Sequence, residues 1–395
     1  MKQKTKWIVM ALLAAALRLG LSWNGTWGHP TDQMCFFSWA QSLAQNGFRD
    51  FYGSVSFCDY PPGYFYLLAP LGWLFTRLNL TYIEPAAAVL LRLPAMLADF
   101  GIGAVLGHLA YQRRGERAAL LTAGSVLFCP LVILNSAVWA QIDSVWCLFL
   151  LLAFAWRKKP VQGAATAAVA LLIKPQALLF FPLLAVVYWD KERFLAVYGK
   201  ALCTGVAVMA ALSLPFCGGD FSVILEKYIG TMTGGYPYAT VNAFNLYALL
   251  GANWKSLEEP FLFATYGFWG RMMIGVSIAA GVFCYCKAKC GPWLSAAVMM
   301  TTLFLFGPMM HERYWFPGIL MILAAYGDSR TEHRALLPAY WAAALANFIN
   351  GILVLASALD NYSTVPPGAM TVSSLLSLAA GCYLYLAVGR ECVRK

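Results

Sequence analysis

The stretch AAVLLRLPAMLADFGIGAVLGHLAY, residues 87–111, decides the fold class of this chain. A basic cluster of Arg113, Arg114 and Arg117 follows it directly. About 20 consecutive apolar residues span a bilayer as a helix, and basic residues collect in the cytoplasmic loops. The stretch therefore predicts a transmembrane helix that ends on the cytoplasmic side.

The composition of the whole chain agrees with this prediction. Of its 395 residues, 61% are apolar and only 12% are charged, and the mean hydropathy is +0.64. Soluble proteins carry roughly 25% charged residues, so this chain could not cover itself with polar surface in water. The composition excludes a soluble enzyme, a disordered chain and a nucleic-acid-binding protein, and it predicts an all-α polytopic membrane protein.

The basic residues indicate the topology, because seven clusters of them separate the apolar runs. Twelve helices with both termini inside place every cluster in the cytoplasm, as the positive-inside rule demands. The clusters begin at Lys2, Arg113, Arg157, Lys191, Lys287, Arg330 and Arg390. The predicted spans are residues 7–22, 87–111, 117–135, 142–156, 160–173, 176–189, 199–215, 260–285, 293–309, 315–327, 335–357 and 369–388.

One apolar segment, residues 62–76, does not fit the alternation of sides. It is shorter than a spanning helix, and counting it as a span would put Arg113 and Arg114 outside. We predict an interfacial helix there, rich in Tyr and Trp. Residues 23–86 then form one long first outer loop, residues 216–259 form a second, and residues 1–395 form a single transmembrane domain.

The first outer loop carries two acidic candidates. Asp32 precedes an amphipathic stretch with apolar residues at 36, 39, 40 and 43, so it is either the N-cap of a helix or a rigidly held general base. Asp59 and Tyr60 precede a Pro-Pro pair that fixes the backbone. The two carboxylates either share a substrate or merely flank a turn.

A short outer loop, NSAVWAQIDS at residues 135–144, places Gln141 and Asp143 at the membrane face. Lys174 and Gln176 follow on the same side within IKPQA. A Lys at this position either extends to the headgroups or turns into a cavity, where it would suit a phosphate group.

A tight outer turn, GPMMHERYWFP at residues 307–317, contains four consecutive polar or amphipathic residues. They are His311, Glu312, Arg313 and Tyr314. Such residues between two apolar spans are costly unless they face water or a site. His and Arg together suit a phosphate or pyrophosphate, and the alternative is a turn that faces the lipid headgroups.

Other polar residues have structural interpretations. Arg92 and Asp99 lie on one face of a predicted span, and we predict a structural pair that bridges to another helix. Cys35 and Cys58 share the first outer loop and could form a disulfide in an oxidising compartment.

The four outer motifs, in this order, resemble the GT-C superfamily of membrane glycosyltransferases. The most similar branch acts on lipid-linked oligosaccharides and uses a lipid-phosphate sugar. The resemblance rests on Asp32 followed by Trp39, on Phe51-Tyr52, on Asp-Tyr-Pro-Pro at 59–62, and on a late His-Glu-Lys turn in which Arg313 replaces the Lys. Such proteins have a long first outer loop with two membrane-parallel helices, and the charge placement predicts the same layout here.

The resemblance implies an inverting hexosyltransferase that uses a polyprenyl-phosphate sugar. It implies that Asp32 is the catalytic general base and that His311 and Arg313 contact the donor phosphate, with Lys174 as a further candidate. It implies no cofactor, since the lipid-phosphate sugar is a substrate, and no metal site, although Asp59 or Asp143 leaves a divalent metal open. Substrate-binding candidates are Asp59, Tyr60, Gln141, Asp143, Gln176, Glu312 and Tyr314.

The expected partners are the donor lipid, a glycan or glycolipid acceptor and the membrane lipids. The short basic inner loops favour a bacterial plasma membrane with the site facing outward, while sequons at Asn24, Asn79 and Asn361 would also suit an ER lumen. The alternative function is a secondary transporter or a flippase. Transporters usually place charged groups at the bilayer midplane, whereas the polar groups here gather at the outer face.

Overall fold

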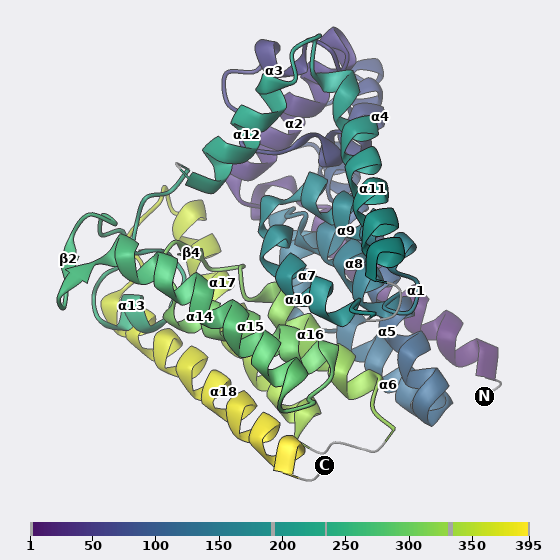
Figure 1. The fold of residues 1–395 in the computed structure, drawn as a ribbon. Helices are drawn as coiled ribbons and strands as arrows, with labels where there is room; N and C mark the ends of the chain where they lie inside the picture. The colour runs from purple at the N-terminus through teal and green to yellow at the C-terminus, as the bar shows by residue number, and fades with distance from the viewer. Residues whose placement is uncertain (1–2, 191–193, 234, 331–334, 394–395) are drawn as a thin grey trace. The chain divides into compact units, whose positions relative to one another are not determined.

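The computed structural model describes residues 3–190, 194–233, 235–330 and 335–393, which are largely helical (Figure 1). The chain forms two compact units. The first comprises residues 1–102, 135–181 and 188–235, and the second comprises residues 103–134, 182–187 and 236–395.

The first unit holds residues 23–86, which are the predicted first outer loop, and several of the helices that follow them. Its helices are α1 (Gln3–Ser22), α2 (Pro30–Asn46), α3 (Phe51–Ser54), α4 (Phe65–Arg77), the first part of α5 (Pro85–Arg114), α8 (Asp143–Ala155), α9 (Pro160–Ile173), α11 (Phe194–Ser213) and α12 (Ser222–Thr233). Shorter turns are the 3-10 helices Gly25–Trp27, Pro62–Tyr64, Pro175–Phe180 and Leu214–Phe216, and the π-helix Leu134–Trp139.

The second unit holds a helical bundle and two small sheets. Its helices are α6 (Glu116–Leu127), α7 (Pro130–Ile133), most of α10 (Phe181–Val187), α13 (Leu246–Leu249), α14 (Tyr266–Cys286), α15 (Pro292–Phe306), α16 (Phe316–Gly327), α17 (Leu336–Leu359) and α18 (Pro367–Val393). Strand β1 (Thr240–Val241) pairs in parallel with β4 (Met310–His311), and β2 (Pro260–Phe261) pairs antiparallel with β3 (Ala264–Thr265).

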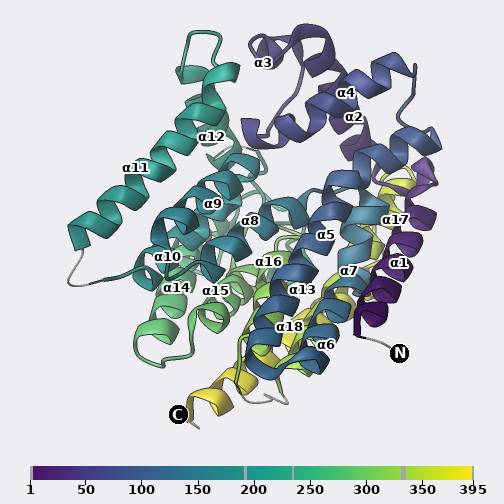
Figure 2. The same ribbon diagram turned by 90° about the vertical axis from the view of Figure 1, so that its right-hand side faces the viewer.

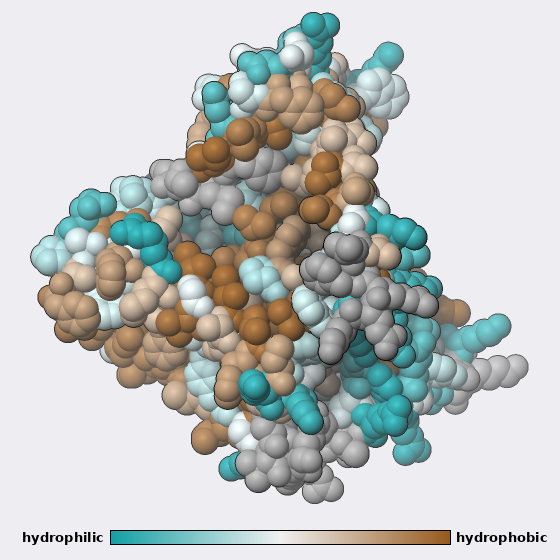
Figure 3. All heavy atoms as spheres, in the orientation of Figure 1, coloured by the Kyte–Doolittle hydropathy of each residue, from teal (hydrophilic) through white to brown (hydrophobic). Residues whose placement is uncertain are grey.

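Six helices of the described residues are long and apolar enough to cross a membrane. They become seven if the pair Glu116–Leu127 and Pro130–Trp139, bent by 44°, counts as one span. Figure 3 shows apolar side chains over much of the visible surface of α14, one of these helices. The protein is therefore an integral membrane protein. Every predicted span overlaps a helix, but five overlap apolar helices of only 10–17 residues, so the total of twelve stays a prediction.

Three predicted spans have the wrong bounds, and in each a proline explains the difference. Helix 117–135 is broken before Pro130, where the fixed ring cannot continue the preceding helix. Helix 176–189 starts as the 3-10 turn Pro175–Phe180. Helix 260–285 starts only at Tyr266, because Pro260 opens a hairpin whose tip residue Leu262 has a left-handed φ of 59°.

The predicted interfacial segment 62–76 is helical, as the 3-10 turn Pro62–Tyr64 followed by α4. Helices α2 and α4 lie side by side (Figure 1, Figure 2). A Cβ at Gly72 would lie 1.7 Å from the carbonyl oxygen of Ala40, so the backbones approach too closely for any other residue. The predicted pair of loop helices is therefore present and tightly packed, while its orientation relative to the membrane stays a prediction.

Candidate active site

Asp32 lies in the first turn of α2, and His29 is the residue that caps this helix. The Nδ1 atom of His29 accepts a hydrogen bond of 3.4 Å from the backbone N–H of Asp32. Pro30 takes the first helical position, where its missing N–H leaves no bond unmade. The prediction that Asp32 caps the helix is therefore wrong, because the helix begins earlier than the amphipathic pattern indicates. The position of Asp32 in the first turn therefore has to be explained by the contacts of its side chain.

The carboxylate of Asp32 is held by two donors from the NSAVWAQIDS loop. Trp139 Nε1 donates to Oδ2 of Asp32 over 2.8 Å, and Gln141 Nε2 donates to the same oxygen. The imidazole of His29 stacks flat on the Trp139 indole, with the ring centroids 5.3 Å apart. The Asp32 side chain is 24% exposed. These contacts fix the orientation of a carboxylate that solvent reaches.

The loop that carries these donors has an unusual backbone. A π-helix spans Leu134–Trp139, and Ala140 directly after it has a left-handed φ of 74°. The backbone N–H of Gln141 donates to the carbonyl of Asn135 over 2.8 Å, which closes the turn. Both π-turns and strained non-glycine residues occur preferentially at functional sites. The strain here points Trp139 and Gln141 toward one carboxylate.

Arg92, which is buried, connects the two sides of this arrangement. Its Nη2 donates to Oε1 of Gln33, next to Asp32, over 2.9 Å. The same Nη2 donates to the carbonyl of Val138, next to Trp139, over 2.9 Å. One guanidinium therefore fixes the spacing between the helix that carries Asp32 and the loop that carries Trp139. The predicted structural role of Arg92 is consistent with these bonds, but its partner is not Asp99.

A second buried network surrounds Asp143. Lys174 Nζ lies 2.7 Å from Oδ1 of Asp143, and both side chains are at most 5% exposed. Asn135 donates to Oδ2 of Asp143 over 2.9 Å, and Trp146 donates to Oδ1 over 3.1 Å. The Lys174 ammonium also lies 5.7 Å from the ring centroid of Tyr60. The alternative in which Lys174 extends to the headgroups is wrong, because the helix break at Pro175 turns its side chain into the protein.

Three further candidates lie in the same unit. Asp59 and Tyr60 are half-buried in the loop before α4, and the Tyr60 ring packs against those of Phe36 and Trp39. Gln176 is half-buried on the 3-10 turn after Lys174. Tyr60 is thus brought next to Lys174 by the fold.

The pKa of the Cys35 thiol is affected by both loop carboxylates, Asp32 and Asp59. Burial, together with smaller contributions from the negative charges of Asp32 and Asp59, raises the pKa of the Cys35 thiol to about 11. Burial, with a smaller contribution from the charge of Asp59, likewise raises the pKa of the Cys58 thiol to about 12. Both cysteines are free thiols, so the predicted disulfide is not formed in this structure. The charge effects place Asp32 and Asp59 in one electrostatic neighbourhood.

We expect Cys35 to react with iodoacetamide at pH 7.5 about 100-fold more slowly than a thiol at the ordinary pKa, because the thiolate is the nucleophile. The variant Asp32→Asn removes a negative charge, lowers the pKa of Cys35 and accelerates the reaction. Mass spectrometry of the alkylated peptides measures both rates, with the exposed thiol of Cys286 as the reference. The placement of Cys35 close to these carboxylates would be contradicted if its alkylation rate equalled that of Cys286 and did not change in Asp32→Asn.

Asp99 forms the most buried charged cluster of the first unit. Arg18 Nε on α1 lies 2.9 Å from Oδ2 of Asp99, and Ser136 and Ser144 donate to its two oxygens over 2.5 Å each. The prediction that Arg92 pairs with Asp99 is therefore wrong. Seven residues along one helix face bring two side chains to the same side, but the charged partner of Asp99 comes from α1.

The His311 turn lies in the second unit and is built on the β1–β4 pair. His311 is at the end of β4 and only 8% exposed. Its ring meets that of Tyr236 edge to face at 4.7 Å and that of Tyr314 at 4.9 Å. Met309 enters the turn with a left-handed φ of 62°. The turn holds His311 between two aromatic rings. A turn that only faces the lipid headgroups would not need its histidine ring fixed in this way.

Glu312 is the buried centre of this turn. Arg313 Nη1 lies 2.6 Å from Oε1 of Glu312, and His311 Nδ1 lies 3.9 Å from Oε2. Asn347 on α17 donates to the Glu312 carbonyl over 2.5 Å. Glu312 therefore orients both basic residues, and the Arg313 side chain is partly exposed at 19%.

Several residues of these networks were not identified by the sequence analysis. They are His29, Gln33, Asn135, Trp139, Tyr236 and Asn347. The dipeptide His29-Pro30 was a usable signal, because Pro is favoured at the first helical position and the cap precedes it. Asn135 lies only eight residues from its partner Asp143, whereas the others lie far from their partners in the sequence, so no local pattern indicates them. Among the described residues, no group of three or more His, Cys, Asp or Glu side chains is placed to hold a metal ion.

Comparison with solved structures gives the fold. The chain is similar to ArnT from Cupriavidus metallidurans in the apo state, with a TM-score of 0.52 at 15% identity over 98% of this chain and 77% of that one. It is equally similar to ArnT from Cupriavidus metallidurans bound to undecaprenyl phosphate, with a TM-score of 0.52 at 16% identity over 98% and 78%. The chain has the GT-C fold. No family model matches the sequence, and no curated protein matches it.

Proposed function

We propose that this protein is an inverting glycosyltransferase that moves a hexose from a polyprenyl-phosphate sugar to a lipid-linked or cell-envelope glycan. The single observation that carries the proposal is the Asp32 carboxylate, oriented by Trp139 and Gln141 at the start of a GT-C first outer loop. The motifs Asp32 to Trp39, Asp59 to Pro62 and His311-Glu312 favour the branch that acts on lipid-linked oligosaccharides.

Asp32 is the general base in this proposal. It takes the proton from an acceptor hydroxyl as that oxygen attacks the anomeric carbon of the donor. The bond between this carbon and the phosphate oxygen breaks, and the lipid phosphate leaves with the electron pair. A single displacement inverts the anomeric configuration. Trp139 and Gln141 hold the carboxylate in one orientation, so the base needs little reorganisation during the reaction.

The donor lipid phosphate requires cationic or hydrogen-bond-donating partners but no proton, because a phosphate is already a good leaving group. The residues proposed to bind this phosphate are His311, Arg313 and Lys174. Glu312, Tyr314, Asp59, Tyr60, Gln141, Asp143 and Gln176 are the proposed substrate contacts. The donor class is supported by the second ArnT structure, which is bound to undecaprenyl phosphate. We place both termini in the cytoplasm of a bacterial plasma membrane and the site on its outer face.

The test uses the full chain purified in detergent and reconstituted in vesicles. Labelled polyprenyl-phosphate glucose, mannose and galactose are supplied with the glycolipid fraction of cells that make the protein. At least one donor should release polyprenyl phosphate and label a glycolipid. Uptake or flipping of a substrate without any turnover of a lipid-linked sugar would instead establish a transporter or flippase.

The bond from Trp139 to Asp32 gives a sharper prediction. Trp139→Phe keeps an aromatic ring against His29 but removes the Nε1 donor. We expect kcat for transfer to fall about 10- to 100-fold, because a hydrogen bond to a charged group contributes about 1.5–3 kcal/mol and 1.4 kcal/mol is tenfold in rate. Steady-state kinetics with the labelled donor measure this change.

The chain offers a matched control for this variant. Trp293 Nε1 donates over 2.9 Å to Oδ2 of Asp328, which is the same kind of bond to a carboxylate. Trp293→Phe should lower the thermal unfolding midpoint to a similar degree and leave kcat within about twofold of wild type. Equal losses of kcat in the two variants would mean that the Trp139 bond only stabilises the fold.

A further inference from the structure

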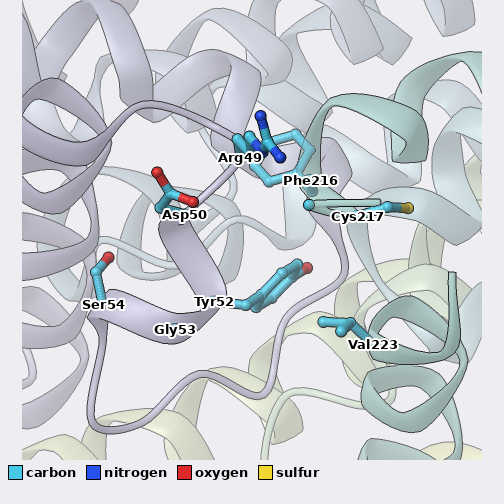
Figure 4. A pocket seen from close by; sticks show the side chains of 9 residues that line it. Arg49, Asp50, Tyr52, Gly53, Ser54, Phe216, Cys217 and Val223 are labelled. Carbon is cyan, nitrogen blue, oxygen red and sulfur yellow. The ribbon is translucent and has the colours of Figure 1, made fainter. Parts of the chain in front are cut away.

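The first unit contains an open cavity of about 380 Å³ that no step of the proposed reaction uses. Its lining residues come from two segments: Arg49, Asp50, Tyr52, Gly53 and Ser54 around α3, and Phe216, Cys217, Gly218 and Val223 before and at the start of α12. Figure 4 shows side chains of both segments around the same space. The cavity is therefore formed by the middle of the predicted first outer loop and the start of the predicted second one.

The lining of the cavity mixes polar and apolar residues, and its two charges are of opposite sign. Arg49 and Asp50 contribute one charge of each sign and are exposed, and Ser54 contributes an exposed hydroxyl-bearing residue. The buried rings of Tyr52 and Phe216 form the inner wall of the cavity. A phosphate site would carry excess positive charge, and a site for a lipid chain would be apolar throughout. Paired charges beside aromatic rings suit an uncharged polyol, which carries both hydroxyl groups and apolar C–H faces.

Hydrogen bonds connect this cavity to the loop that carries Asp59. The Tyr52 hydroxyl donates to the carbonyl of Tyr60 over 3.0 Å. Lys227 Nζ lies 5.4 Å from the Tyr52 ring centroid and donates to the carbonyl of Cys58 over 3.4 Å. The cavity wall is thus bonded to the residues on both sides of Asp59. A glycan held in the cavity would lie along the same loop as the acidic candidates.

We infer that this cavity binds uncharged sugar units of the glycan acceptor. This inference rests on the proposed function and extends it, since it assigns the acceptor to a subsite formed by both predicted outer loops. The terminal sugar presents its hydroxyl to the base, and the sugars behind it occupy the cavity. Arg49 supplies donors and Asp50 supplies acceptors to sugar hydroxyls, with Tyr52 beneath them.

Gly53 allows the cavity to be filled without disturbing the fold. It lines the cavity, a Cβ added to it would have no heavy atom within 4 Å, and its φ is not in the left-handed region. Gly53→Trp should therefore raise the KM for the acceptor glycolipid at least tenfold. The KM for the donor and the kcat at saturating acceptor should stay within twofold of wild type. Gly230→Trp on α12 is the matched control, because Gly230 is also exposed with open space around its Cα, but lies outside the cavity.

The outcomes separate this inference from the proposed function. If wild type releases no polyprenyl phosphate from any donor, the proposed function fails. If wild type is active and Gly53→Trp leaves the acceptor KM unchanged, the cavity is not the acceptor subsite. An equal rise in the donor KM would assign the cavity to the donor and overturn the inference as well. Thermal unfolding of both tryptophan variants should match that of wild type, and Arg49→Ala with Asp50→Ala provides a second variant that raises the acceptor KM without adding bulk.

Discussion

Replacing Asp32 with asparagine is expected to lower kcat for sugar transfer by about 10²- to 10⁴-fold, the usual contribution of general base catalysis. Asparagine has nearly the same shape and still offers an oxygen to Trp139, so the loop geometry is preserved. It cannot accept the proton of the acceptor hydroxyl. The KM for the donor should change little, because Asp32 acts on the acceptor. Labelled-donor kinetics at saturating acceptor measure the loss.

The control is Asp220→Asn, which removes a carboxylate from an exposed position of the second outer loop. Hydrogen bonds from the backbone N–H and side chain of Ser222 hold the pKa of Asp220 below its usual value, so this variant also removes a full negative charge. Its kcat should match that of wild type. If Asp32→Asn is as active as Asp220→Asn, Asp32 is not the base.

The second large effect is expected at the buried pair of Asp143 and Lys174. Lys174→Met leaves the Asp143 carboxylate buried without its cation, and breaking such a pair costs about 3–5 kcal/mol of the free energy of unfolding. The thermal midpoint in detergent should fall by several degrees. Replacing both residues, in Asp143→Leu with Lys174→Met, removes the uncompensated charge and should recover most of the lost stability.

The same two variants test whether Lys174 also contacts the donor phosphate. If it does, the KM for the donor rises in Lys174→Met and stays raised in the double variant, although stability returns. A donor KM that returns to the wild-type value would show that Lys174 only neutralises Asp143. A double variant that is no more stable than Lys174→Met would mean that the ion pair is not the source of the effect.

The helices were largely predictable because the free energy of transfer into the bilayer depends on the residues of each apolar run itself. The residues that start and end a helix also lie within or next to the same run. Helix α9 occupies residues 160–173 as predicted, since Pro160 starts it and the apolar run ends at Lys174. The errors occurred where a proline or a hairpin interrupted an apolar stretch, as at Pro130 and Pro260. Hydropathy averages over such an interruption and does not detect it.

The candidate residues were predictable as types, but their partners were not. The WAQIDS motif was identified as polar residues at the membrane face, yet the donation from Trp139 and Gln141 to Asp32 joins positions more than 100 residues apart. Equally, Asp99 was placed in a span with Arg92, but its partner is Arg18, 81 residues away. The role of each residue in catalysis stays a prediction for the variants above.

The sequence by itself determined that this chain resides in a membrane and where most of its helices lie, and it predicts which segments are the polar outer loops. These properties are sums over neighbouring residues, so a window of about 20 residues contains them. Only the tertiary structure decided that His29 rather than Asp32 caps α2, that Lys174 pairs with Asp143, and that Arg92 connects α2 to the Trp139 loop. Such pairings depend on how separate helices pack, and the low dielectric of the interior then requires each buried charge to find its partner across that packing.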